Sequence, residues 1–180
     1  IMAEVIQPTI RGLAADGLRY RGFLYAGIMV TADGTPKVLE YNCRLGDPET
    51  QPILLRLKSD LLDLVEAACH GGLANQIAVW DSRAALGVVM AAPGYPGEYP
   101  KGSAIRLGQD MADTKVFHAG TAMSNDQPVT AGGRVLCVTA LGSGVTEAQA
   151  KAYERLRTVQ FEGAEYRTDI GYRAVERENA

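Results

Sequence analysis

The stretch from Lys37 to Glu49, KVLEYNCRLGDPE, decides how the rest of the chain is interpreted. Its first half has the composition of a β-strand, in which Glu40 and Asn42 lie side by side on one face. A carboxylate and an amide carbonyl in this arrangement suit a hard cation such as Mg²⁺. Gly46 and Pro48 then predict a turn directly after the strand. We therefore interpret this stretch as half of an active site.

The residues before this stretch predict a helix followed by an antiparallel hairpin. Gly22 to Thr31 is a nearly continuous apolar run rich in strand-forming residues, and Asp33-Gly34 after it is a strong hairpin signal. Lys37 to Cys43 is then the returning strand. Met2 to Asp16 is typical of a helix, with a kink or break expected near Gln7 because Pro8 follows.

The residues after the stretch predict one more helix and then a change of character. A helix capped by Ser59 or Asp60 is expected to run to about His70 and to end at Gly71-Gly72. A polar connection follows, and we predict a domain boundary near Asp81. The expected domains are therefore residues 1–81 and residues 82–180.

The second predicted domain is rich in short strands. Ala84 to Ala92 and Arg134 to Leu141 are apolar enough to be buried strands, and shorter strands are expected between residues 116 and 129. Thr146 and Gln149 have the spacing of a capping box, which predicts a helix from there to about Val159. Residues 166–180 are polar and predict a surface tail with one short turn or helix.

Composition excludes several functional classes. A formal net charge of −3 over 180 residues argues against a protein that binds nucleic acid through a broad basic surface. No apolar stretch is long enough to span a membrane. The cysteines, Cys43, Cys69 and Cys137, have neither zinc-site nor disulfide-framework spacing, which fits a reducing, cytoplasmic compartment.

The Glu40-x-Asn42 pair followed by Arg44 resembles the metal-binding strand of ATP-grasp ligases. A longer series of segments is similar to one family, the phosphoribosylamine–glycine ligases, and occurs in the same order. These segments are FLYAGIMV (23–30), LEYNCRLGDPETQP (39–52), LKSDL (57–61), GVVMAAPGYPG (87–97), KVFHAGT (115–121), GGRVLCVTALG (132–142) and YRTDIGYRA (166–174).

This resemblance implies an α+β fold, in which the C-terminal half of an ATP-grasp module is followed by a small β-rich C-terminal domain. It also implies that the N-terminal half of the same protein is the partner of this chain, and that the chain alone is inactive. The implied enzyme joins glycine to 5-phosphoribosylamine with ATP, through a glycyl phosphate. The products are glycinamide ribonucleotide, ADP and phosphate, and the pathway is purine biosynthesis.

Under this resemblance, Glu40 and Asn42 hold Mg²⁺ or Mn²⁺. Without it, Glu40 is equally well an exposed strand residue and Asn42 an incidental turn residue. Arg44 could bind a phosphate or the carboxylate of glycine, or could instead pair with Asp47 or Glu49.

Three further residues have roles implied by the resemblance. Asp47 is expected to contact the ammonium of glycine or the phosphoribosylamine, or to be a simple turn residue. Glu49 is a weaker candidate for substrate binding. Leu39, on the opposite face of the strand from Glu40, could pack on adenine or be a plain core leucine.

The residue at position 27 differs from the one that many other ATP-grasp enzymes have, and this difference bears on the choice of family. Many of them carry a second acidic metal ligand thirteen residues before the glutamate, and this sequence has Gly27 there. The glycine favours the glycine-ligase family over carboxylating relatives. A different ATP-grasp ligase of purine biosynthesis and a non-catalytic module that keeps the fold remain alternatives. In the C-terminal half, Lys101 and Arg134 are candidates for the ribose phosphate, and neither is assigned.

Overall fold

The structure, a computed structural model, describes residues 1–180 and divides them into two compact units. The first unit contains residues 1–47 and 59–78, and the second contains residues 48–58 and 79–180. The boundary expected near Asp81 stays a prediction. Residues 48–58 pack with the second unit, although they precede a helix of the first unit in the chain.

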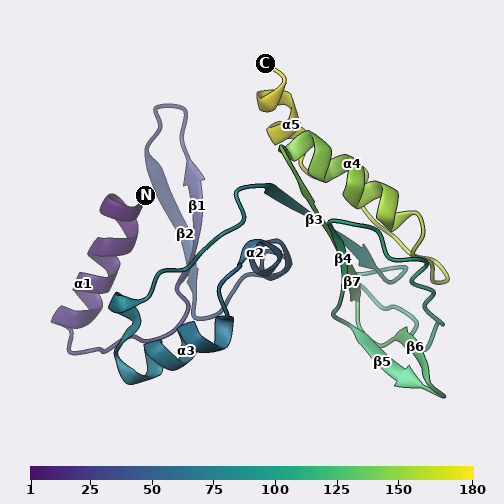
Figure 1. The fold of residues 1–180 in the computed structure, drawn as a ribbon, viewed down its shortest axis with the longest axis horizontal. Helices are drawn as coiled ribbons and strands as arrows, with labels where there is room; N and C mark the ends of the chain where they lie inside the picture. The colour runs from purple at the N-terminus through teal and green to yellow at the C-terminus, as the bar shows by residue number, and fades with distance from the viewer. The chain divides into compact units, whose positions relative to one another are not determined.

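The first unit consists of an N-terminal helix, a β-hairpin and a second helix (Figure 1). Its elements are a π-helical stretch (Met2–Ile6), α1 (Gln7–Ala15), β1 (Tyr25–Val30), β2 (Pro36–Asn42), α3 (Leu61–His70) and a 3-10 turn (Leu73–Asn75). The predicted break near Gln7 is a π-helical stretch that continues into α1. Pro8 lies in the first turn of α1, directly after the π-helical stretch.

The predicted hairpin and the second predicted helix are confirmed. β1 and β2 are antiparallel, with the register broken by an irregularity between Gly27 and Ile28. Asp60 caps α3, because its Oδ1 accepts a hydrogen bond of 2.7 Å from the Leu62 N–H. Gly71 ends α3 with a left-handed φ of 78°.

The first unit has almost no core of its own. Val5 is its only buried apolar side chain. The hairpin exposes large apolar side chains, among them Met29, Val30 and Leu39, which is 66% exposed.

The second unit is built on a three-stranded antiparallel sheet in the order β3-β7-β4, with a separate hairpin of β5 and β6 (Figure 1). Its elements are α2 (Thr50–Arg56), β3 (Ala84–Ala91), β4 (Thr114–His118), β5 (Thr121–Ser124), β6 (Gln127–Thr130), β7 (Arg134–Gly142), α4 (Val145–Leu156) and α5 (Tyr172–Glu178). β7 is central and almost wholly buried, as its apolar sequence predicts.

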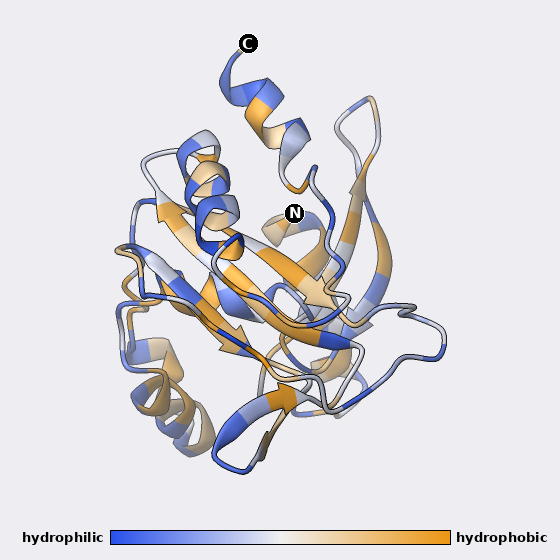
Figure 2. Cartoon of the chain, turned by 90° about the vertical axis from the view of Figure 1, so that its right-hand side faces the viewer, coloured by the Kyte–Doolittle hydropathy of each residue, from blue (hydrophilic) through white to orange (hydrophobic).

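The core of the chain lies in the second unit, between this sheet and α4. Leu86, Val88 and Met90 of β3 pack with Leu136 of β7 and with the apolar face of α4, which presents Ala148, Ala152 and Leu156. Figure 2 shows apolar residues along the strands beneath this helix. Apolar area buried at about 25 cal/mol per Å² stabilises this unit.

One helix of the second unit was not predicted, and one local prediction is corrected. The unpredicted helix is α2, which contains Pro52 in its first turn, where proline is tolerated. The capping box at Thr146 is wrong, because α4 begins at Val145 and its first free N–H groups bind Glu178. The Val145 and Thr146 N–H groups donate to the two Glu178 oxygens at 2.8 and 2.7 Å.

The mixed helical and antiparallel content confirms the α+β class. None of the helices has the length and apolar character that crossing a membrane would require. All three cysteines are free thiols.

Candidate metal and substrate site

Glu40 and Asn42 meet at the end of β2, as the strand pattern predicts. The Asn42 amide donates to the Glu40 Oε1 over 3.1 Å, so the two side chains reach a common point. Glu40 is exposed and Asn42 is half-buried. The pair is therefore open to a ligand from solvent.

Across the hairpin, Gly27 is the Cα partner of Glu40. A Cβ at Gly27 would lie 3.1 Å from the Glu40 Cγ and would crowd this side chain. The glycine thus leaves room for the glutamate on β2 and supplies no ligand from β1.

The oxygen atoms of this pair fit a hard divalent cation. Glu40 provides a carboxylate, and rotation of the Asn42 amide would turn its carbonyl oxygen toward the same point. No group of three or more His, Cys, Asp or Glu residues gathers elsewhere as a metal cluster. A site with two protein ligands is typical of Mg²⁺, because Mg²⁺ keeps several waters and phosphate oxygens in its coordination shell.

Three other predicted site residues, Arg44, Asp47 and Glu49, follow β2 in the chain. Arg44 and Asp47 belong to the first unit, and Glu49 belongs to the second. Arg44 is exposed, donates to the Leu45 carbonyl at 3.2 Å and makes no ion pair. Asp47 is exposed in the first unit, whereas Glu49 is half-buried in the second. Both residues have interaction partners. The pairing of Arg44 with either carboxylate is therefore not observed.

Leu39 lies on the other face of β2 from Glu40. Its neighbour on that face, Tyr41, shares a hydrogen bond of 2.6 Å with Thr9 of α1. That bond ties the strand to α1 while Leu39 stays largely exposed. An adenine contact at Leu39 stays a prediction.

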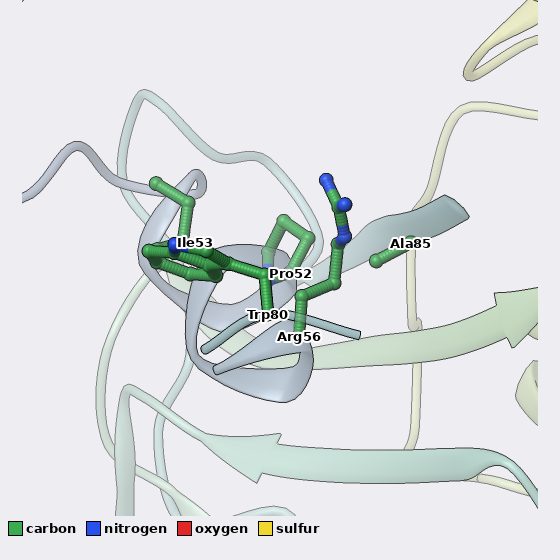
Figure 3. Close-up of a pocket in the computed structure, with 5 residues that line it drawn as sticks. All are labelled: Pro52, Ile53, Arg56, Trp80 and Ala85. Atoms are coloured by element: carbon green, nitrogen blue, oxygen red, sulfur yellow. The ribbon is translucent and has the colours of Figure 1, made fainter. Parts of the chain in front are cut away.

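The second unit contains a pocket that sequence reasoning missed. A cavity of about 640 Å³ is lined by Pro52, Ile53, Arg56, Trp80 and Ala85. In Figure 3, the Trp80 ring lies beside Ile53, and Arg56 rises on the side of Ala85. Both Nε and Nη2 of Arg56 donate to the Asp81 carbonyl, at 3.2 and 2.9 Å. The exposed, solitary tryptophan was the signal that could have pointed to it.

A chain of ion pairs fixes the start of β3 in the second unit. Arg83 donates to both oxygens of the buried Asp81 and also pairs with Asp113 at 2.6 Å. These hydrogen bonds hold the pKa of Asp81 well below its usual range. Lys151 of α4 joins the same network through Asp113. The network therefore ties the start of β3 to α4.

Two domains of one protein family match different parts of the chain. Residues 1–50 match "Phosphoribosylglycinamide synthetase, ATP-grasp (A) domain", and residues 85–173 match "Phosphoribosylglycinamide synthetase, C domain". A hairpin that carries the Glu40–Asn42 pair within such a match defines an ATP-grasp protein. The chain belongs to the phosphoribosylamine–glycine ligase family.

The chain is 57% identical over its whole length to the phosphoribosylamine–glycine ligase of Vibrio cholerae. It is 58% identical to that of Allochromatium vinosum, and 56% identical to that of Escherichia coli O6:H1 over 98% of the chain. It spans 42% of the length of each of these relatives.

Solved structures agree with this assignment. The crystal structure of phosphoribosylamine–glycine ligase from Thermotoga maritima matches 94% of this chain and 42% of its own, with a TM-score of 0.83 and 41% identity. The biotin carboxylase domain of the Hydrogenobacter thermophilus 2-oxoglutarate carboxylase matches 89% of this chain and 36% of its own. Its TM-score of 0.62 at 12% identity indicates a shared fold alone.

Proposed function

We propose that this chain supplies the metal-binding strand and the C-terminal domain of an ATP-dependent ligase that joins glycine to 5-phosphoribosylamine. The reaction gives glycinamide ribonucleotide, ADP and phosphate, a step of purine biosynthesis. The observation that carries the proposal is the meeting of Glu40 and Asn42 at the end of β2, in a chain of this family. The named activity of the relatives supports the choice of substrates.

In this proposal, Glu40 and Asn42 hold the divalent cation. Mg²⁺ is the first candidate and Mn²⁺ the second, since both accept oxygen ligands. When bound, the cation would neutralise the negative charge that develops on the phosphate group during its transfer. The role of the two side chains is to fix the position of that positive charge at the end of β2.

The residues after β2 position the small substrate. Arg44 presents a planar fork that suits the carboxylate of glycine or a phosphate, and its single bond to the Leu45 carbonyl leaves the fork exposed. Asp47 would bind an ammonium group, and Glu49 is the weaker substrate ligand. Leu39 would contact the adenine. Holding the reactants in line is the main contribution that such residues make to catalysis.

The partner of this chain, in this proposal, is the N-terminal half of the same protein. The apolar side chains that the hairpin exposes, and the single buried apolar residue of the first unit, support a surface that another part of the ligase covers. We expect the 180-residue chain alone to be inactive. Phosphate release by that chain alone would contradict this part of the proposal.

Substrate-dependent phosphate release by the full-length protein tests the function. With Mg²⁺ and ATP present, release should require glycine and 5-phosphoribosylamine together. Bicarbonate in place of glycine should give no release. Phosphate release with bicarbonate but not with glycine would favour a carboxylating ATP-grasp ligase. Gly27 argues against this alternative. A cytoplasmic location stays a prediction.

A non-catalytic module is the second alternative. Calorimetric titration of the full-length protein with Mg²⁺ and ATP separates it from the ligase. Metal-dependent ATP binding should weaken when Glu40 becomes Ala. Equal metal-dependent binding by both proteins would contradict a working site at Glu40.

A further inference from the structure

One cavity of the second unit has no role in the proposed function. Five residues line it, all of them from that unit: Pro52, Ile53, Arg56, Trp80 and Ala85. Its volume of about 640 Å³ lies within the range of about 300–1,000 Å³ that is typical of small-molecule sites. Such sites also combine mostly apolar walls with a few polar groups in defined positions. The cavity therefore has the size and the composition of a ligand site.

One face of α2 forms a wall of this cavity. Pro52 and Ile53 precede Arg56 by four and three residues, so both are its neighbours on the helix surface. The sheet supports this wall, because the Pro52 Cδ would lie 3.6 Å from a Cβ built at Gly87 of β3, which is an ordinary van der Waals contact. The three side chains therefore reach the cavity from a helix that packs on the sheet of the second unit.

Trp80 contributes an exposed aromatic ring from a fixed backbone. Trp80 and Leu57 form an isolated antiparallel bridge, and backbone hydrogen bonds of 2.7 and 2.9 Å close it on either side. The tryptophan is nevertheless 47% exposed, and its indole N–H makes no hydrogen bond to the protein. In Figure 3, the ring lies beside Ile53. A large, flat apolar surface is thus left open at the cavity, although tryptophan is highly buried on average.

The guanidinium of Arg56 is anchored at one edge and free at the other. Its Nε and Nη2 donate to the Asp81 carbonyl over 3.2 and 2.9 Å. Its Nη1 has no partner in the protein, and no ion pair neutralises the side chain. In Figure 3, the side chain rises beside Pro52, on the side of Ala85. Because its planar fork is already held, Arg56 loses little rotamer freedom when an anion binds to the free edge.

We propose that this cavity binds an aromatic monocarboxylate, with its ring packed on Trp80 and its carboxylate on the free edge of Arg56. The two oxygens of a carboxylate match the two N–H groups of such an edge. A single guanidinium balances one negative charge, which favours a carboxylate over a phosphate group with its charge of about −1.5 to −2. The ring of the ligand would cover the exposed indole in an offset or edge-to-face arrangement. The site goes beyond the proposed function, which uses neither Trp80 nor Arg56.

Calorimetric titration of the full-length protein with 2-naphthoate tests the proposal. The wild type should bind 2-naphthoate roughly tenfold more tightly than 2-naphthamide, which has the same rings but no charge. It should also prefer 2-naphthoate to cyclohexanecarboxylate, which has the charge but no aromatic ring. Saturating Mg²⁺ and ATP should not displace 2-naphthoate. Equal affinities for 2-naphthoate and 2-naphthamide, or displacement by ATP, would overturn the proposal.

Arg56→Lys keeps the positive charge and removes the planar fork. The preference for 2-naphthoate over 2-naphthamide should fall several-fold, because lysine cannot bind a carboxylate through two parallel N–H groups. Arg106→Lys is the matched control, since Arg106 is an exposed arginine of the same unit whose side chain makes no hydrogen bond or ion pair. An unchanged preference in Arg56→Lys, or an equal fall in Arg106→Lys, would contradict a site at Arg56. The comparison of compounds on the wild type decides the proposal even if Arg56→Lys does not fold.

Trp80→Leu tests the aromatic wall. Affinity for 2-naphthoate should fall several-fold, as for a lost aromatic pair, while the melting temperature stays near the wild-type value because Trp80 is exposed. Tyr172→Leu is the control, since Tyr172 is a 40% exposed aromatic residue of the same unit that does not line the cavity. In a nitrogen-15 NMR spectrum of the full-length protein, the indole N–H signal that Trp80→Leu removes should shift when 2-naphthoate is added. A signal that stays in place at saturating 2-naphthoate would exclude the ligand from this cavity.

Discussion

Gly27 and Glu40 lie directly opposite each other across the β1–β2 hairpin, and a methyl group on Gly27 would approach the Glu40 Cγ to 3.1 Å. The side chain that is expected to hold the metal therefore depends on a residue without a side chain. Crowding from β1 would push Glu40 away from its preferred rotamer. The hairpin pairing thus links the backbone of one strand to the chemistry of the other.

Gly27→Ala should impair the use of metal. Displacing Glu40 from its rotamer costs about 0.5–1.5 kcal/mol, which is roughly a two- to tenfold change in an equilibrium constant. The Mg²⁺ concentration for half-maximal activity of the full-length protein should rise by this factor. Gly12→Ala is the control, because a Cβ at Gly12 meets no atom within 4 Å. An unchanged Mg²⁺ requirement in Gly27→Ala would show that the contact does not matter.

Arg155 should be essential to the stability of the second unit. It is 1% exposed, and its Nη1 donates to the Leu107 carbonyl and to the Thr158 hydroxyl. Arg155→Met would leave the Leu107 carbonyl without this donor, at a cost of about 1–3 kcal/mol. The melting temperature should fall by several degrees.

Arg157 provides the comparison for Arg155. It is exposed on the following turn, so Arg157→Met should leave the melting temperature within about one degree, as surface substitutions usually do. Equal shifts in the two variants would mean that the buried guanidinium contributes no more than an exposed one.

Glu147 should make stability depend on acid pH. Hydrogen bonds from Ser143 and the nearby Lys151 lower its pKa from 4.5 to about 2. A carboxylate with a lowered pKa in the folded state stabilises the fold above its ordinary pKa and loses that contribution as pH falls toward the folded value. The stability difference between wild type and Glu147→Gln should therefore be largest near neutral pH and shrink between about pH 4.5 and pH 2.

Melting curves at a series of pH values measure this difference. Glu154→Gln is the control, because Glu154 is an exposed residue of the same helix that makes no hydrogen bond or ion pair. Its difference from wild type should stay small across the range. A Glu147→Gln difference that does not shrink below pH 4.5 would contradict the role of the carboxylate.

Local sequence patterns predicted most of the elements. Alternation placed Glu40 and Asn42 on one face of β2, and the Asp33-Gly34 signal predicted the hairpin, because both depend on neighbours in the chain. The buried strand β7 was equally clear from its apolar run. These local patterns do not predict a reaction. The reaction was predicted from the resemblance to one family.

Features that depend on distant residues could not be predicted. The N-terminus of α4 is capped by Glu178, far along the chain, so a local capping box at Thr146 gave the wrong answer. The packing of α2 with the second unit depends on tertiary contacts rather than on its own sequence.

The turnover of full-length Glu40→Ala tests the central claim most directly. Removing the carboxylate that holds the cation should reduce phosphate release with ATP, glycine and 5-phosphoribosylamine by about a hundredfold or more, since the metal contributes several kcal/mol. The melting temperature should remain near the wild-type value, because Glu40 is exposed. Wild-type turnover in Glu40→Ala at limiting Mg²⁺ would contradict the account.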